Sequence, residues 1–132
     1  MPLVVDPNKS GFEKVLRDYQ IKALKMVWNS EDEGVTSREV YLHVNNVLEG
    51  KTISRASIIN FLNAMCNENV LAYVEETCKG GIRRKYSPAL DEEGFKRYIA
   101  QSVFESLMKD FPTQTIAALK ETLGSRAGEV GL

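Results

Sequence analysis

The sequence is poor in the residue types that build metal centres and disulfide frameworks. It has two cysteines, Cys66 and Cys78, and one histidine, His43. Two cysteines do not make the framework of a small secreted domain, and these three residues do not make a four-ligand zinc set. We therefore expect no metal and no cofactor. Cys66 is expected to be buried or half-buried in a helix and Cys78 to be exposed at a hairpin, where a redox-sensing thiol stays open as an alternative.

Long apolar runs and catalytic motifs are also lacking. No apolar run approaches the ~20 residues that span a bilayer, and the first residues lack the charged start and apolar core of a signal peptide. We therefore expect a cytoplasmic protein without a membrane partner. The sequence contains no glycine-rich phosphate loop, no Ser/His/Asp or Cys/His set and no paired carboxylates outside acidic surface runs. We expect that it is not an enzyme.

The net charge of −1 lacks the excess of one sign that is typical of nucleic-acid-binding proteins, but the charge is unevenly distributed. Residues 51–90 contain six Lys/Arg and three Asp/Glu, whereas residues 1–50 contain six and eight, and residues 91–132 five and seven. The positive charge is therefore concentrated in one stretch, which a dimer would present twice.

That stretch begins with a predicted helix. Ser54 is a good N-cap residue, and an apolar stripe follows it at helical spacing. The residues of this stripe are Ile58, Phe61, Leu62 and Met65. The opposite face is small, uncharged and rich in amides, with Ala56, Asn60, Asn63 and Asn67, and it is flanked by Arg55 and Ser57. Because Asn pairs with adenine and Arg with guanine in the major groove, this face is suited to reading bases; an ordinary soluble surface is the alternative.

A cationic hairpin is predicted directly after this helix. Residues 70–77 and 82–87 are rich in strand formers, residues 79–81 supply the turn, and Pro88 should end the second strand. Ile82, Arg84 and Tyr86 should share one face of that strand, and Arg83 and Lys85 the other. A polar helix followed by a basic hairpin is typical of a winged helix-turn-helix. The residues predicted to contact DNA are Ser54, Arg55, Ala56, Ser57, Asn60, Asn63, Lys79, Arg83, Arg84 and Lys85.

Two further helices are predicted before this stretch. Residues 12–30 repeat apolar positions at three- and four-residue steps, and Trp28 is expected to be a core anchor. Thr36 opens the next helix with a capping box completed by Glu39. Its inner stripe is expected to contain Val40, Val44 and Val47, with His43 exposed and Gly50 providing the stop.

The residues after Asp91 predict two helices with more apolar surface than a small winged-helix unit can cover. Pro112 suits the first turn of the second helix, and Gly124 is expected to end it. We expect these helices to pair with a second copy of the chain. The predicted dimerisation residues are Phe95, Tyr98, Ile99, Val103, Phe104, Leu107, Met108, Phe111, Ile116, Leu119 and Leu123.

With these elements laid out, the sequence resembles the penicillinase-repressor family of winged-helix transcription factors. The similar segments, between about Tyr19 and Pro88, are MVW, VTSREVYLHV, SRASIINFLNAM, VLAYVEE and GIRRKYSP. A glycine is common in that family between the third helix and the wing. Asn69 stands here instead and can also adopt the left-handed conformation. The resemblance implies a homodimeric DNA-binding regulator, usually a repressor.

The expected fold is mainly α with a small β-hairpin: a winged helix-turn-helix in residues 12–90 and a helical dimerisation region in residues 91–124. Residues 1–11 and 125–132 are expected to be flexible ends. The leading functional hypothesis is a homodimeric, sequence-specific transcriptional regulator that binds a pseudo-palindromic operator in double-stranded DNA. The alternative is a winged-helix protein–protein interaction module within a larger assembly.

Overall fold

The computed structural model describes residues 3–30 and 33–126 of the chain. It divides into two compact units, Met1–Phe95 and Lys96–Leu132. The described elements are the 3-10 turn η1 (Gly11–Lys14), α1 (Asp18–Ser30), β1 (Val35–Thr36), α2 (Ser37–Val47), α3 (Arg55–Asn67), β2 (Leu71–Cys78), β3 (Gly81–Pro88), α4 (Glu92–Asp110) and α5 (Pro112–Arg126).

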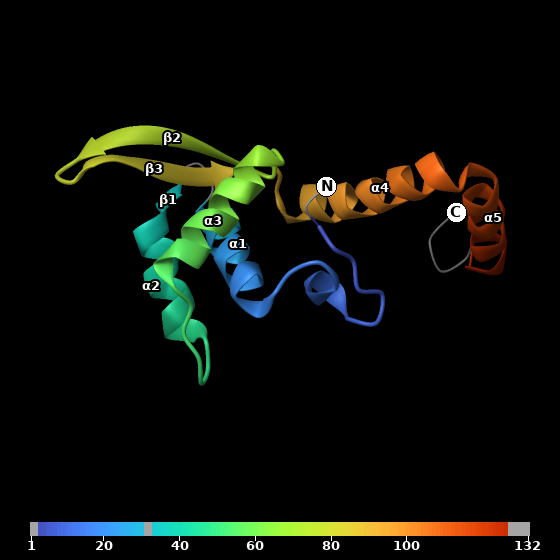
Figure 1. Ribbon diagram of the computed structural model, residues 1–132, viewed down its shortest axis with the longest axis horizontal. Coiled ribbons are helices and arrows are strands. Elements are labelled where there is room, and N and C mark those ends of the chain that lie inside the picture. Colours follow the sequence, from blue (N-terminus) through green and yellow to red (C-terminus); the bar gives the residue numbers. More distant parts are fainter. Residues whose placement is uncertain (1–2, 31–32, 127–132) are drawn as a thin grey trace. The chain divides into compact units, whose positions relative to one another are not determined.

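The first unit is a winged helix-turn-helix. Helices α1, α2 and α3 pack on one another, and β2 and β3 form an antiparallel hairpin that extends beyond them as the wing (Figure 1). The sheet has the order β1-β3-β2, so the short strand β1 pairs with the inner strand of the hairpin. The expected fold class, mainly α with a small hairpin in a winged helix-turn-helix arrangement, is confirmed for this unit.

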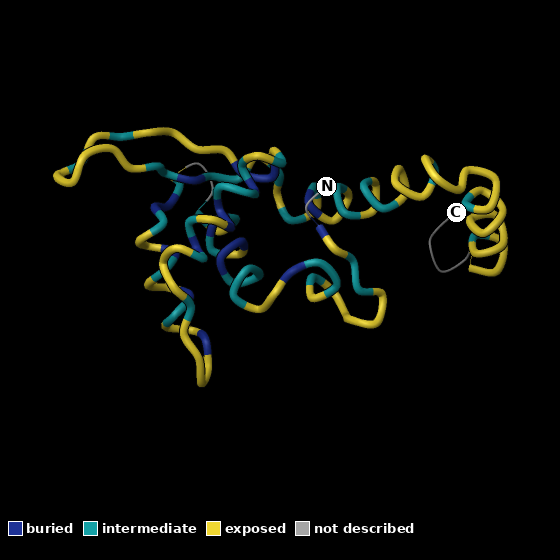
Figure 2. Tube along the Cα trace, in the orientation of Figure 1, coloured by how far each residue is buried: buried dark blue, intermediate teal, exposed yellow. Residues whose placement is uncertain are grey.

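The core of the first unit is apolar and comes from all three helices (Figure 2). The core includes an aromatic cluster, in which the ring centroid of Phe95 is 5.7 Å from the ring centroids of both Phe12 and Trp28. The indole Nε1 of Trp28 also donates to the carbonyl oxygen of Leu90 at 3.0 Å. Trp28 is therefore a core anchor, as expected, and Phe95 is fully buried beside it.

The first helix starts later than the periodicity indicates. Residues 11–14 form a 3-10 turn, and α1 begins only at Asp18. The backbone nitrogen of Arg17 donates to the side chain of Gln20 at 2.9 Å, which is a local cap for the new helix start. The predicted single helix over residues 12–30 is therefore wrong in its first turns.

The second helix is capped as predicted. Oγ1 of Thr36 accepts from the backbone nitrogen of Glu39 at 3.2 Å, and Oε1 of Glu39 accepts from the backbone nitrogen of Thr36 at 3.1 Å. Val40 and Val44 are buried, but Val47 is 37% exposed. The predicted inner position of Val47 is wrong because α2 ends there, and the extended chain buries Leu48 instead.

Strand β1 was not predicted. Its pairing requires the preceding segment to approach β3 closely, and Gly34 makes this approach possible. A side chain at Gly34, which has φ +75°, would place its Cβ 2.9 Å from the carbonyl oxygen of Tyr86. Only glycine fits this position without displacing the β3 backbone.

The N-terminal segment, which was expected to be a flexible end, contributes one buried side chain, Leu3. The backbone nitrogen of Asp6 also donates to the carbonyl oxygen of Lys14 at 2.7 Å. At the other end, α5 continues to Arg126, two residues past the expected stop at Gly124. Residues 127–132 lie outside the described residues.

Candidate nucleic-acid interface

The candidate interface is formed by α3 and the wing of the first unit. The N-cap of α3 is as predicted: Oγ of Ser54 accepts from the backbone nitrogen of Ser57 at 3.1 Å, and the two hydroxyls lie 2.9 Å apart. Ile58, Phe61, Leu62 and Met65 are buried, as the apolar stripe predicts. Burial of this stripe turns the opposite face of α3 away from the core.

That outward face is largely open. Ser54, Arg55, Ala56, Asn60 and Asn67 are exposed, and Ser57 is half-buried. Asn63 differs from its neighbours because it is half-buried and its side chain is engaged. Its Oδ1 accepts from Nη1 of Arg84 at 3.0 Å and from the hydroxyl of Tyr86 at 2.7 Å. Asn63 thus lies on the predicted polar face of α3 but joins this helix to strand β3, a contact that the sequence analysis did not predict.

The start of α3 is held by a residue that the sequence analysis missed. Asn45, near the end of α2, accepts from the backbone nitrogen of Ile53 at 2.8 Å and donates to the carbonyl oxygens of Tyr41 and Ile53 at 3.0 and 3.1 Å. One amide thus fastens the turn between α2 and α3. An Asn close to a helix end, before a turn, was the available signal.

The wing is a two-residue hairpin that turns at Lys79 and Gly80, with Cys78 opposite Gly81. Strand β3 ends at Pro88, as predicted. Asn69, before β2, has φ 61°, which confirms the left-handed conformation expected at this position. Cys66 and Cys78 are free thiols of intermediate exposure, so the expectation that Cys78 is exposed is only partly met. Burial raises the pKa of the Cys66 thiol.

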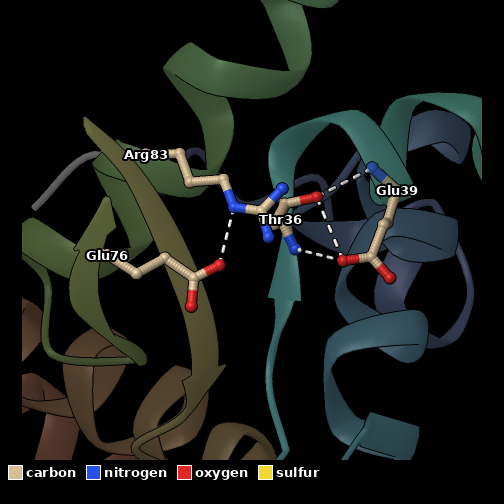
Figure 3. A network of polar contacts seen from close by, with 4 residues as sticks. All are labelled: Thr36, Glu39, Glu76 and Arg83. Carbon is tan, nitrogen blue, oxygen red and sulfur yellow. Dashed lines mark hydrogen bonds and ion pairs between the residues drawn. The ribbon is translucent and has the colours of Figure 1, made fainter. Parts of the chain in front are cut away.

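The hairpin register brings acids opposite the wing cations. Glu75 pairs with Arg84 and Glu76 with Arg83. Nε of Arg83 on β3 lies 2.6 Å from Oε1 of Glu76 on β2. The two side chains face each other across the hairpin (Figure 3). The hydrogen bond with Glu76 raises the pKa of Arg83, and the charge of Glu39 adds to this rise. Sequence reasoning counted the four cations but missed the carboxylates that strand pairing places beside them.

The cations of the wing therefore differ in their surroundings. The guanidinium of Arg84 is stacked on Tyr73, with Cζ 4.0 Å from the ring centroid, in addition to its bond with Asn63. Arg83 is exposed but ion-paired. Lys79 is exposed at the tip and Lys85 is half-buried, and neither side chain has an ion pair or a hydrogen bond among the described residues. All four keep part of their surface in solvent.

The second unit carries an apolar groove between α4 and α5. It has a volume of about 400 Å³ and is lined by Phe104, Leu107, Phe111, Gln114, Thr115, Ala118, Leu119 and Thr122. Phe104, Leu107 and Phe111 are 39%, 42% and 56% exposed, and Ile116 and Leu119 are similarly open. Phe95, one of the predicted dimerisation residues, is buried in the core of the first unit instead. It is therefore not available for a dimer contact.

Within residues 3–30 and 33–126, no group of three or more His, Cys, Asp or Glu side chains is arranged to hold a metal ion. None of the described helices is long and apolar enough to cross a membrane. Both findings concern only these parts of the chain.

No family model and no curated protein sequence matches the chain. Among solved structures, the chain is similar to ZitR of Lactococcus lactis, a zinc-responsive MarR family member. The sequence identity is 15% and the TM-score 0.43, and the alignment covers 97% of this chain and 83% of that chain. The element order, the hairpin and the sheet topology of the chain itself define its winged-helix fold.

Proposed function

We propose that this chain is a sequence-specific DNA-binding regulator of transcription. The observation that carries the proposal is the exposed N-terminal half of α3, with Arg55, Ala56 and Asn60, next to a wing that carries four cations. This half-helix bears no carboxylate, so it can approach a polyanion without repulsion. The buried opposite face of α3 keeps the exposed one turned to solvent.

In this proposal α3 lies in the major groove, where the side chain of Asn60 pairs with adenine and that of Arg55 contacts guanine or phosphate. Ser54, Ala56 and Ser57 lie at the start of the helix and contact the sugar-phosphate backbone of the DNA or a thymine methyl group. Lys79, Arg83, Arg84 and Lys85 of the wing bind phosphates and supply a sequence-independent share of the affinity through counterion release.

We further propose that the second unit forms a closed homodimer. Its apolar groove is too exposed for a surface that stays in water, because contiguous apolar patches mark interfaces. The proposed contact residues are Tyr98, Ile99, Val103, Phe104, Leu107, Met108, Phe111, Ile116, Leu119 and Leu123. A two-fold dimer would bind a pseudo-palindrome whose half-sites lie about 10 base pairs, or a multiple of that, apart.

The resemblance to the penicillinase-repressor family supports a repressor, which would act in the cytoplasm by occupying its operator. In this arrangement residues 12–90 form the DNA-binding domain and residues 91–124 the dimerisation region. Phe95 is the exception, because its ring completes the core of the first unit.

Selection of bound duplexes from a random DNA pool tests the function directly. We expect the full chain to enrich one pseudo-palindromic sequence and to bind it more tightly than random duplex, with an affinity that falls steeply with salt. A chain carrying Lys9→Ala and Lys25→Ala serves as the charge control, because both lysines are exposed and outside the proposed interface. Recovery of unrelated sequences, with salt-independent binding, would contradict the proposal.

A protein–protein interaction module is the second candidate, favoured by the open apolar groove of the second unit and by the acids beside the wing cations. In that case the groove binds a different protein and the wing contacts no phosphate. A stable hetero-complex formed without any DNA binding would favour this candidate. A homodimer that binds a selected duplex and slows its migration in a gel would favour the DNA-binding regulator.

A further inference from the structure

The side-chain oxygen of Asn63 is fully used within the chain. It accepts two hydrogen bonds, from Nη1 of Arg84 at 3.0 Å and from the hydroxyl of Tyr86 at 2.7 Å. A side-chain amide oxygen has two lone pairs. Oδ1 of Asn63 therefore has no acceptor capacity left for a ligand.

The orientation of this amide is fixed by chemistry. A guanidinium group only donates hydrogen bonds, so the Asn63 atom that faces Arg84 must be the oxygen and not the nitrogen. Arg84 is itself held, since its guanidinium lies 4.0 Å from the ring centroid of Tyr73. Tyr86 is only 2% exposed. Three neighbouring side chains thus keep the amide of Asn63 from turning over.

The amide nitrogen of Asn63 is available. Both hydrogen bonds of the Asn63 side chain use Oδ1, and Nδ2 has no partner among the described residues. Every buried side-chain nitrogen or oxygen atom of those residues does have a partner. Nδ2 must therefore reach solvent. Asn63 also lies three residues after Asn60 and four before Asn67, both exposed, so the three share one helical stripe.

Building on the DNA-binding function proposed above, we propose that Asn63 determines specificity as a donor-only reader. An Asn with both amide groups free makes the two-bond pair with adenine, donating to N7 and accepting from N6. Asn63 lacks the accepting half, so it favours guanine, whose N7 and O6 both accept. It disfavours cytosine, whose major-groove edge offers an amino donor. Asn60, with its amide exposed, keeps the adenine pairing.

The variant Asn63→Asp separates the two ends of this amide. One carboxylate oxygen still accepts from Arg84 and Tyr86, so the contact between α3 and β3 is kept, while the other replaces the N–H donors by an acceptor. Asn67→Asp is the matched control, because it adds the same charge one turn further along the same stripe.

The experiment starts from a duplex selected by the wild-type chain and measures binding to all its single-base-pair substitutions. For Asn63→Asp we expect one position per half-site to change its preference from guanine to cytosine. The expected change in relative affinity is on the order of tenfold. Asn67→Asp should weaken all duplexes alike, and thermal unfolding should show that both variants are folded.

A second measurement needs no variant. Replacing each guanine of the selected duplex by 7-deazaguanine removes the N7 acceptor, and the wild-type chain should lose affinity at the position that Asn63→Asp alters. Uniform weakening by Asn63→Asp, an unchanged base preference, or wild-type insensitivity to every 7-deazaguanine would overturn the inference while leaving the regulator function intact. Failure of the wild-type chain to select any sequence would instead overturn the function itself, and the inference with it.

Discussion

At the scale of single residues, several polar side chains of the first unit are held by contacts within the chain. Asn45 holds the turn before α3, Asn63 joins α3 to β3, and Glu76 pairs with Arg83. Each of these contacts restricts a side chain near the proposed DNA surface. Restricting such a group before binding lowers the ordering cost that recognition would otherwise incur.

Tyr86 gives this network a pH dependence. Its hydroxyl donates to Asn63, and burial raises the pKa of Tyr86 above the ordinary value of about 10. The folded chain therefore holds this proton more tightly than the unfolded chain. The contribution of Tyr86 to the free energy of unfolding is complete below about pH 10 and is lost as the pH rises through the raised pKa.

We accordingly expect Tyr86→Phe to lower the free energy of unfolding by about 1 kcal/mol near neutral pH, the usual net contribution of one hydrogen bond. The difference from wild type should shrink above about pH 10. Urea denaturation across this pH range measures it. Tyr41→Phe is the control, because the Tyr41 hydroxyl has no hydrogen bond among the described residues. A difference that stays constant to high pH would contradict the assignment.

Asn60 is expected to read a base directly. Its side chain is exposed near the start of α3, so Asn60→Ala should cost about 1–3 kcal/mol on the selected duplex and little on random DNA. Asn67→Ala, nearer the end of the same helix, should change both affinities little. Fluorescence anisotropy with the two duplexes measures the effect. Equal losses on both would show that Asn60 does not read sequence.

The predictions for single residues were confirmed where a side chain binds the backbone a few positions away in sequence. They failed where the partner is distant in sequence. The caps at Thr36 and Ser54 were predicted because each involves a residue three positions away. The engagement of Asn63 was not, because Arg84 and Tyr86 follow it by 21 and 23 residues. That the named residues of α3 and the wing contact DNA stays a prediction for all of them.

At the scale of elements, helical periodicity predicted α2, α3, α4 and α5 nearly to their ends. Strand β1 was missed because two residues carry no period, and its pairing depends on the close approach at Gly34. Both strands of the wing were predicted, but the carboxylates facing its cations follow from the register of the hairpin, which places Glu76 opposite Arg83.

The wing should act mainly through phosphates. Replacing Arg83 and Lys85 together with Ala should weaken binding to the selected duplex and to random DNA alike. It should also make the dependence of log K on log salt shallower by about one unit for each lost contact. Salt titrations of wild type, this variant and the Lys9→Ala, Lys25→Ala control measure the slopes. A slope equal to that of wild type would show that the wing stays off the DNA.

The ion pair across the wing allows the opposite change. Glu76→Gln removes the carboxylate that faces Arg83, so the freed guanidinium should bind phosphate and strengthen binding to any duplex, with a steeper salt dependence. Stability should change little, because the pair is solvent-exposed. The same titrations test this, with Glu121→Gln on the exposed surface of α5 as the control for lost negative charge. Unaltered affinity would mean that Arg83 is not a phosphate contact.

At the scale of the whole molecule, the two units carry different parts of the proposed function, and the boundary between them decides how they can be separated. Leu90 accepts the hydrogen bond from Trp28, and the fully buried Phe95 packs on Phe12 and Trp28. A chain ending at residue 90 therefore loses part of the core of the first unit. A chain ending at residue 97 keeps it.

We expect the chain of residues 1–97 to fold as a monomer. The chain of residues 1–90 should be less stable by about 3–5 kcal/mol, the range for removing a buried Phe side chain. The 1–97 chain should lose most of its affinity for the selected palindrome, because its two half-sites are no longer bound by linked subunits at high effective concentration. Its affinity for a single half-site should stay near that of one wild-type subunit.

In the full chain, Phe111→Glu places a charge in the apolar groove and should also lower the affinity for the palindrome, whereas Thr113→Glu on the exposed surface should not. Sedimentation of all these chains at micromolar concentration, together with binding to whole and half sites, measures both consequences. A full chain that sediments as a monomer would rule out the closed dimer, and a dimeric 1–97 chain would place its interface in the first unit.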